Sequence, residues 1–159
     1  MKRAGEIQTT GLIADPIYHY IVMTDRVEGE ETERDVIDTP WVQRLRRIFQ
    51  LQSARWVYPS AEHTRFQHSL GTLHIAGAFS EQLYPSLSRI DQAEVPSSFY
   101  IEELLRLAGL LHDIGHGPFC HFFDEQYLSR FKTNHEEIGQ HIIQERVAPI
   151  LKRIRRSPH

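Results

Sequence analysis

The stretch "LLHDIGHGPFCHFFDE", residues 110–125, places three histidines and two aspartates among apolar and aromatic side chains. Its apolar start is typical of the end of a buried helix, which Gly115, Gly117 and Pro118 then interrupt. From Pro118 the sequence predicts a short second helix that extends through Leu128. We therefore expect two helices that meet at a glycine-rich turn, with the ionisable side chains gathered at that turn.

His112 and Asp113 stand at the end of the first of these helices. Adjacent residues point about 100° apart along a helix, but a helix end followed by glycine lets the backbone turn both side chains inward. An imidazole nitrogen and a carboxylate oxygen together suit a divalent metal ion. His68, near the start of the preceding long helix, is the best candidate for a third ligand. The core that holds the stretch in place is expected to be Leu110, Leu111, Phe119 and Phe122.

The long helix before this stretch is expected from about Phe66 to Leu83 and should end at Pro85. Gly71 and Gly77 lie inside it and indicate close packing against a neighbouring element, or a ligand near the backbone.

Two further helices carry recognisable start and stop signals. One is capped by Ser98, and its expected core face consists of Ile101, Leu104, Leu105, Ala108 and Leu111 or His112. The other begins at Asn134, where "NHEE" is typical of a capping box, and runs to about Val147, stopping before Pro149.

The first third of the chain changes its pattern twice. Residues 11–23 contain β-branched and aromatic residues in rough alternation and predict a short strand or hairpin. Residues 24–36 are charged and predict a solvated loop. Thr39 and Pro40 then predict a helix start, with one apolar face that consists of Trp41, Leu45, Ile48 and Phe49. The expected fold class is mainly α with a small N-terminal β element.

The composition of the 159 residues is that of one soluble globular domain, with 40% hydrophobic and 25% charged residues. No apolar run approaches the roughly 20 residues that span a bilayer, and the start of the chain lacks a signal peptide's apolar segment. A single cysteine indicates a cytoplasmic protein, and a net charge of −3 makes a nucleic-acid partner unlikely. Eight of the ten histidines fall between His63 and His141, which favours a functional site there.

Five motifs follow one another in an order that resembles the HD-domain phosphohydrolases: "DPIYHYI", "IDTPWVQRLRRIFQL", "HTRFQHSLG", "AGLLHDIGHGPFCH" and "NHEEIG". The resemblance is closest to the dNTP triphosphohydrolase branch of that family. It covers most of the chain, from about Leu12 to Ile143, and is therefore far more specific than one His-Asp pair. It implies a single HD domain over residues 1–159, built as a helical bundle.

The resemblance also implies roles for individual residues. The matching metal ligands are His68, His112 and Asp113. The matching groups around the scissile phosphate are His116, His121, Asp124 and His135. Arg65 matches a residue that contacts the bound nucleotide. Asp124 follows His121 by three residues on the expected short helix, so its carboxylate can orient that imidazole or hold it protonated.

A regulatory site is implied by positions in "WVQRLRR" and just before it. Asp38, Gln43 and Arg46 match positions where nucleotide-activated members hold a guanine nucleotide between subunits. A simpler interpretation of this segment is a solvated helix face.

The fourth metal ligand of the family is an aspartate well downstream of "NHEEIG", and no aspartate follows Asp124 in this sequence. The domain is therefore expected to lack the C-terminal part of the family domain. Exposed apolar residues would then favour a homo-oligomer, namely Ile142, Ile143, Val147, Ile150 and Leu151.

The implied reaction is the hydrolysis of a dNTP to a deoxynucleoside and triphosphate, as in a dGTPase. Fe, Mn or Zn would occupy the His/His/Asp site, with Mg on the nucleotide phosphates. His121 would protonate the leaving group, with Asp124 as its partner. Two alternatives stay open. One is a catalytically incomplete HD fragment that acts as a nucleotide-binding or regulatory module. The other is an HD hydrolase of nucleoside monophosphates or cyclic nucleotides.

Overall fold

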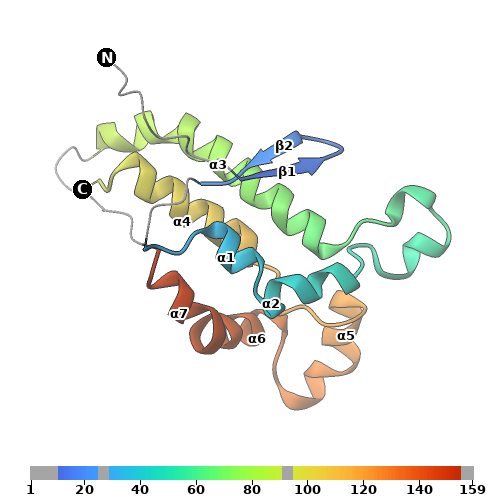
Figure 1. Ribbon diagram of the computed structural model, residues 1–159. Coiled ribbons are helices and arrows are strands. Elements are labelled where there is room, and N and C mark those ends of the chain that lie inside the picture. Colours follow the sequence, from blue (N-terminus) through green and yellow to red (C-terminus); the bar gives the residue numbers. More distant parts are fainter. Residues whose placement is uncertain (1–10, 25–28, 91–94, 155–159) are drawn as a thin grey trace.

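The computed structural model describes residues 11–24, 29–90 and 95–154. Over these ranges the chain is mainly helical and has one two-stranded sheet, which confirms the expected fold class. Figure 1 shows the two longest helices, α3 (Arg65–Ile90) and α4 (Ser98–Leu111), side by side, with the strands next to α3. Within the described ranges, no helix combines the length and the apolar character that crossing a membrane requires.

The expected hairpin is present as β1 (Leu12–Asp15) and β2 (His19–Val22), antiparallel, with the first residue of each strand opposite the last residue of the other. The Asp15 carboxylate closes the turn by accepting hydrogen bonds from two backbone N–H groups. The Tyr18 ring lies 3.2 Å from the place where a Cβ on Gly71 would stand, so the glycine lets the hairpin pack closely on α3.

A short helix, α1 (Glu33–Ile37), occupies a segment that the sequence predicts as a solvated loop, so that prediction is wrong for these residues. The Asp35 carboxylate accepts a hydrogen bond from the Thr32 N–H at 2.8 Å and caps the helix. Glu33 is fully buried and accepts a hydrogen bond from Arg106 at 2.8 Å. Charged residues occur both in solvated loops and in buried ion pairs, so the charge of this segment alone did not predict the helix.

The predicted helix after Thr39 is shorter and tighter than expected. Thr39 is the N-cap, with its hydroxyl accepting from the Val42 N–H at 3.4 Å, but α2 (Pro40–Gln43) passes into a 3-10 turn, η1 (Arg44–Arg47). Ile48 is already extended. Two more 3-10 turns lead to α3, namely η2 (Gln52–Trp56) and η3 (Pro59–Ala61).

Both predicted boundaries between α3 and α4 are wrong. Pro85 lies inside α3, which continues to Ile90, although a proline within a helix removes one backbone hydrogen bond. The cap of α4 is Ser97 and not Ser98, because the Ser97 hydroxyl accepts from the Tyr100 N–H at 3.3 Å.

The predicted core face of α4 is only partly right, because Leu111 is buried as expected but most of the other predicted positions are not. Leu104 and Leu105 are 52% and 39% exposed, whereas Arg106 is buried. The ion pair of Arg106 with Glu33 turns this side of the helix inward. The buried residues of α4 are Glu103, Arg106, Gly109, Leu110 and Leu111. Leu104 and Ala108, which the apolar pattern placed in the core, instead line an open groove of about 730 Å³ between α4 and the C-terminal helices.

The C-terminal elements are α5 (Cys120–Gln126), the 3-10 turn η4 (Leu128–Phe131), α6 (His135–Ile142), the π-helical η5 (Ile143–Val147) and α7 (Ala148–Leu151). The short helix that was expected from Pro118 through Leu128 therefore spans only α5. Asn134 is the N-cap of α6, and its side chain accepts from the Glu137 N–H at 2.9 Å, as predicted. The helical chain does not stop before Pro149 as predicted, because the π-helical η5 leads directly into α7, in which Pro149 is the second residue.

The core lies between the α3–α4 pair, the hairpin and the shorter helices, and its fully buried members include Ile21, Val36, Val42, Leu45, Leu73, Leu110 and Ile114. Phe119 and Phe122 are 54% and 57% exposed, so their predicted place in the core is wrong. The predicted exposed apolar face is wrong as well. Ile142 and Val147 are buried, and the other three residues pack against the core, namely Ile143, Ile150 and Leu151.

Candidate metal centre and histidine cluster

Three predicted ligands meet where α3 begins and α4 ends. His68 stands in the first turn of α3, His112 is the C-cap of α4, and Asp113 follows it. The two Nε2 atoms of His68 and His112 are 3.2 Å apart. The Asp113 oxygens lie 3.5 Å from His68 Nε2 and 3.4 Å from His112 Nε2. The structure therefore brings together the residues that the sequence analysis assigned to the metal.

These spacings fit one metal ion. Donor atoms bound at about 2.0–2.2 Å stand about 3.4 Å apart at a tetrahedral angle and about 3.0 Å apart at a right angle. The His112 Nδ1–H donates to the Gly109 carbonyl at 2.7 Å, which leaves the Nε2 lone pair facing the centre. Burial lowers the pKa of His68, against the attraction of Asp113, and so favours the neutral imidazole that a metal requires.

Of the three residues, Asp113 contacts the most neighbouring charged or polar side chains. Its side chain is buried, and burial alone would raise the pKa of its carboxyl group. The hydrogen bond from His116 and the positive charge of Arg65 outweigh burial and hold the pKa well below its usual range. The carboxylate is therefore charged, as a metal ligand should be.

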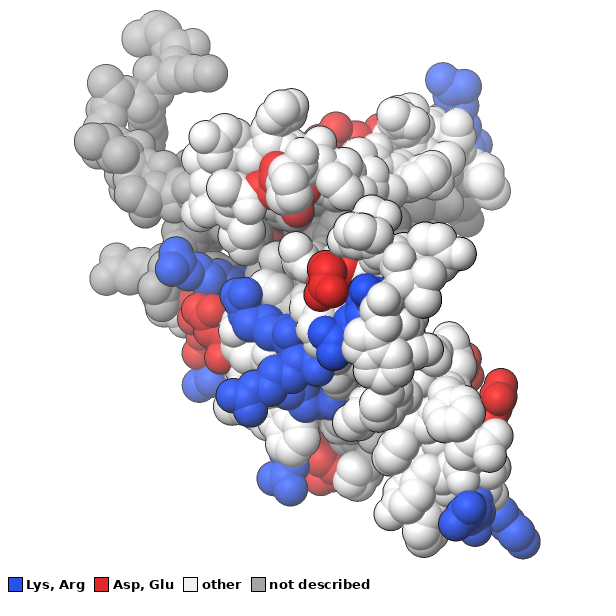
Figure 2. All heavy atoms as spheres, turned by 90° about the vertical axis from the view of Figure 1, so that its right-hand side faces the viewer, with Lys and Arg blue, Asp and Glu red and all other residues white. Residues whose placement is uncertain are grey.

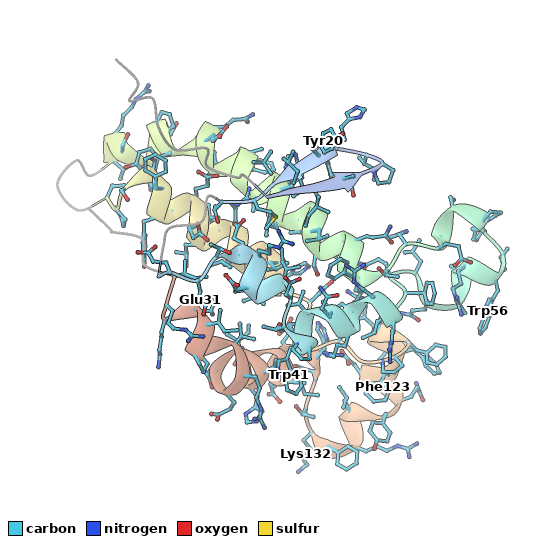
Figure 3. The ribbon with its side chains drawn as sticks, viewed as in Figure 1. Tyr20, Glu31, Trp41, Trp56, Phe123 and Lys132 are labelled. Atoms are coloured by element: carbon cyan, nitrogen blue, oxygen red, sulfur yellow. The ribbon has the colours of Figure 1, made fainter. Side chains whose placement is uncertain are left out.

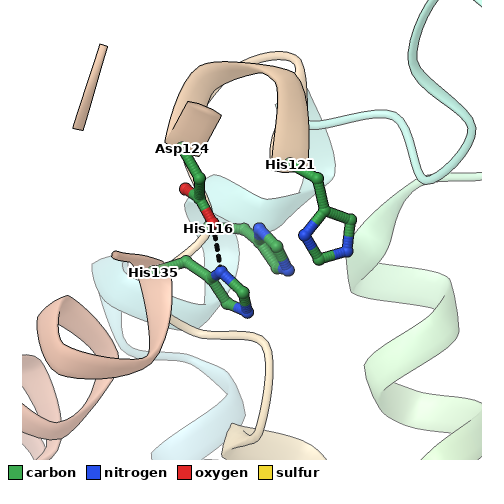
Figure 4. Close-up of side chains that lie close together, drawn as sticks. All are labelled: His116, His121, Asp124 and His135. Atoms are coloured by element: carbon green, nitrogen blue, oxygen red, sulfur yellow. Dashed lines mark hydrogen bonds and ion pairs between the residues drawn. The ribbon is translucent and has the colours of Figure 1, made fainter. Parts of the chain in front are cut away.

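Four more predicted residues form a second cluster beside the first, composed of His116, His121, Asp124 and His135 (Figure 4). The His116 and His135 rings are stacked, with centroids 3.8 Å apart and planes 10° apart. The His121 ring stands edge-on to both of them. The His135 Nδ1–H donates to Asp124, so the carboxylate has its hydrogen bond with α6 and not with His121, the partner that helical spacing suggested.

The second cluster suits proton transfer better than metal binding. Imidazole lone pairs lie in the ring plane, so the parallel His116 and His135 rings direct theirs along separate planes and not toward one ion. Two of the cluster's buried atoms, His116 Nδ1 and Asp124 Oδ1, have no hydrogen-bond partner within the described part of the chain. Such atoms are typical of sites that bind water or ligand.

The two clusters are connected through Asp113 and His116. His116 is 1% exposed, and its Nε2 lies 3.4 Å from Asp113 Oδ1. Burial lowers the pKa of His116, against the hydrogen bond with Asp113 that raises it. A group bound at the metal centre would therefore be next to imidazoles that can carry a proton.

The loop between α4 and α5 is fixed by contacts on two sides. A Cβ on Gly115 would stand 1.9 Å from the His135 carbonyl oxygen, so only glycine allows α6 to approach this closely. The Phe123 side chain, labelled in Figure 3, packs in the same way on Gly117. The Arg44 guanidinium also donates hydrogen bonds to two of the loop's carbonyls. Arg44 is a residue that the sequence analysis missed, because nothing in its segment distinguishes it from its exposed neighbours.

Arg65 lies beneath the metal centre. It is 3% exposed, pairs with the Asp113 carboxylate, and donates from Nε to the Cys120 sulfur at 2.9 Å. The Arg65 side chain thus contacts one residue of the metal centre, Asp113, and the first residue of α5, Cys120. A contact between Arg65 and a nucleotide stays a prediction.

The residues expected to bind an activator lie on one surface segment. Gln43 donates from Nε2 to the Ile37 carbonyl at 2.9 Å, and Arg46 donates to Gln43 at 2.7 Å. The Arg46 guanidinium also stands 3.7 Å from the centre of the Phe66 ring. Asp38 is exposed and lies 3.8 Å from Arg34. Figure 2 shows a band of lysine and arginine side chains across the face of the molecule turned to the right in Figure 1.

Two known proteins are similar in sequence to most of this chain. The chain is 32% identical over 135 residues to "Deoxynucleoside triphosphate triphosphohydrolase SAMHD1 homolog" of Dictyostelium discoideum, which covers 83% of this chain and 24% of that protein. It is 38% identical over 142 residues to "Deoxynucleoside triphosphate triphosphohydrolase SAMHD1" of Bos taurus, which covers 86% of this chain and 22% of that protein. The chain thus spans about a quarter of the length of these relatives.

A solved structure is similar over nearly the whole chain. The crystal structure of a hypothetical protein from Aquifex aeolicus has a TM-score of 0.68 and 36% sequence identity, over 92% of this chain and 34% of that one. The HD domain family matches residues 65–156, more than half of the 159 residues, and the match includes all three residues of the metal centre. The chain belongs to the HD domain family.

Proposed function

We propose that this protein hydrolyses deoxynucleoside triphosphates to a deoxynucleoside and inorganic triphosphate. The observation that carries the proposal is the pairing of a metal-spaced trio with a histidine cluster through Asp113. The names of the Dictyostelium and bovine relatives support the choice of substrate. The family supports a divalent metal, for which Fe, Mn or Zn is proposed, with Mg on the nucleotide phosphates.

Each cluster has its own task in this proposal. His68, His112 and Asp113 would hold the metal, which when bound polarises a phosphate oxygen and acidifies water. His121, exposed at the edge of the second cluster, would donate a proton to the leaving oxygen. Asp124 would hold His135 in one tautomer and orientation, so that His135 presents Nε2 to the substrate. His116 would keep Asp113 in place and contact phosphate.

Two further parts of the proposal concern the phosphate chain and regulation. Arg65 would bring positive charge under the phosphates. The exposed segment with Asp38, Gln43 and Arg46 would bind a guanine nucleotide activator in a homo-oligomer. Both proposals rest on the resemblance described above.

The test is product analysis with the purified chain. Each of the four dNTPs is incubated with Mn²⁺ or Fe²⁺, and the expected products are a deoxynucleoside and inorganic triphosphate. His112→Ala should abolish the reaction, whereas His141→Ala, an exposed histidine of α6, should leave it intact. Pyrophosphate or monophosphate as product would contradict the proposal. Nucleotide binding without hydrolysis would mean a binding module, and nucleoside monophosphates and cyclic nucleotides are tested as substrates in parallel.

A further inference from the structure

Arg44 joins the η1 turn to the loop that carries Asp113 and His116. Its Nη1 donates to the His116 carbonyl oxygen at 2.8 Å, and its Nη2 donates to the Ile114 carbonyl oxygen. One guanidinium thus bonds two main-chain oxygens that lie two residues apart. The planar, two-nitrogen shape of arginine matches such a pair of acceptors.

Arg44 is a partly buried cation with an unusual set of partners. Its side chain is partly buried, and burial lowers its pKa. The ion pairs found among the described residues do not include Arg44. Its charge is therefore compensated through the loop's carbonyl groups, which makes these hydrogen bonds charge-assisted and stronger than neutral ones.

The bonded backbone lies in the middle of the site. Residues 114–116 connect the metal ligand Asp113 to His116, and the His116 N–H donates to the Asp113 carbonyl at 3.1 Å. α6 also packs against Gly115, so closely that a Cβ is excluded. The loop is thus held by contacts with both Arg44 and α6.

We propose that Arg44 is a positioning residue that fixes the backbone of residues 114–116 and so orients the Asp113 carboxylate and the His116 ring. The inference rests on the proposed function only in assigning those two side chains to metal and phosphate. Residues that hold a metal ligand in place typically contribute about 10–100-fold to metal affinity or activity.

The experiment compares Arg44→Met and Arg44→Lys with Arg47→Met, a change at an exposed arginine of the same turn. Amide hydrogen exchange of peptides that cover residues 112–118 reports the loop without metal or substrate. Co²⁺ affinity and the visible spectrum of bound Co²⁺ report the geometry of the metal centre.

Arg44→Met should speed exchange in residues 112–118 but not in the interior of α4, and should weaken Co²⁺ binding about 10–100-fold with an altered spectrum. Arg44→Lys should show the same changes to a smaller degree, because an ammonium keeps the charge but not the planar pair of donors that bonds two carbonyls at once. Arg47→Met should match the wild type in every measurement.

Unchanged exchange and unchanged Co²⁺ affinity in Arg44→Met would overturn the proposal. Unfolding of both Arg44 variants would also overturn it, since Arg44 would then support the whole fold and not the loop. A wild-type chain that hydrolyses no dNTP, with the exchange effect of Arg44→Met intact, would remove the proposed function and leave the role of Arg44 standing.

Discussion

His112 shows how one hydrogen bond prepares a side chain for a metal. Its Nδ1–H is directed to the Gly109 carbonyl at 2.7 Å, so the neutral ring offers Nε2 alone to the centre. That atom is within 3.4 Å of both a second imidazole and a carboxylate. Without an ion, the Nε2 lone pairs of the two histidines and the Asp113 carboxylate repel one another. A bound cation would be attracted by all three groups.

Removing this ligand should remove the metal. His112→Ala is expected to abolish tight Co²⁺ or Mn²⁺ binding, since two donors remain. The wild-type Tm should rise when metal is added, because an ion that binds only the folded chain stabilises it by mass action. Metal analysis and thermal melts check this, with His141→Ala as the control. A metal-dependent Tm shift that persists in His112→Ala would place the ion elsewhere.

Asp124→Asn should separate metal binding from proton transfer. The variant loses the negative charge of the carboxylate that accepts the hydrogen bond from His135, so kcat should fall roughly 10²-fold. Co²⁺ affinity should stay close to the wild-type value, because the stacked rings of the second cluster do not converge on an ion. Loss of Co²⁺ together with activity would show that Asp124 is itself a ligand.

Single residues were predictable where a motif fixes their chemistry. His68, His112 and Asp113 were expected together and are together, and so are the four residues of the second cluster. The partner of Asp124 was not predictable, because spacing within α5 describes one helix and His135 comes from another. Arg44 was missed for the same reason, since both of its acceptors are about 70 residues away in sequence.

At the scale of elements, periodicity located the helices but not their orientation. Pro85 was expected to end α3, yet the helix continues past it to Ile90. The apolar face expected of α4 was right only at Leu111, because a buried charge, Arg106, faces inward. A sequence pattern cannot distinguish a buried charged residue that has a partner from an exposed one. For the same reason, the segment that forms α1 was predicted as a loop.

The close contact between the loop and α6 can be tested by substitutions at two glycines, Gly115 and Gly139. Gly115→Ala should lower the free energy of unfolding by about 3 kcal/mol, the upper end of the usual cost of overpacking, because its Cβ would stand 1.9 Å from the His135 carbonyl oxygen. Gly139→Ala, on the other side of the same contact, would place its Cβ 3.4 Å from the Gly115 backbone nitrogen, an ordinary van der Waals distance. It should be neutral or stabilise α6 by up to about 1 kcal/mol. Urea denaturation measures both, and equal effects would contradict the packing described.

At the scale of the whole molecule, one buried ion pair connects three parts of the fold. Arg106 of α4 donates two hydrogen bonds to Glu33 of α1 and a third, at 2.7 Å, to the Val22 carbonyl of β2. Burial opposes the charge of Arg106, but the bonds and the charge of Glu33 raise its pKa above the usual value. The hairpin, α1 and the α3–α4 pair are therefore held together by one polar contact inside an apolar core.

Breaking this pair from one side should destabilise the entire chain. Arg106→Met leaves the carboxylate of Glu33, which is fully buried, without its cation, and should cost about 3–5 kcal/mol of unfolding free energy. The double variant Glu33→Leu with Arg106→Met should recover much of that loss, since two apolar side chains need no partner. Arg34→Met is the matched control, because it breaks a pair with Asp38 in which both side chains are more than 60% exposed, and should cost at most about 1 kcal/mol. Urea denaturation of the four proteins decides. A double variant as unstable as Arg106→Met alone would mean that the cost is one of lost packing and hydrogen bonds to β2, and not of an unpaired buried charge.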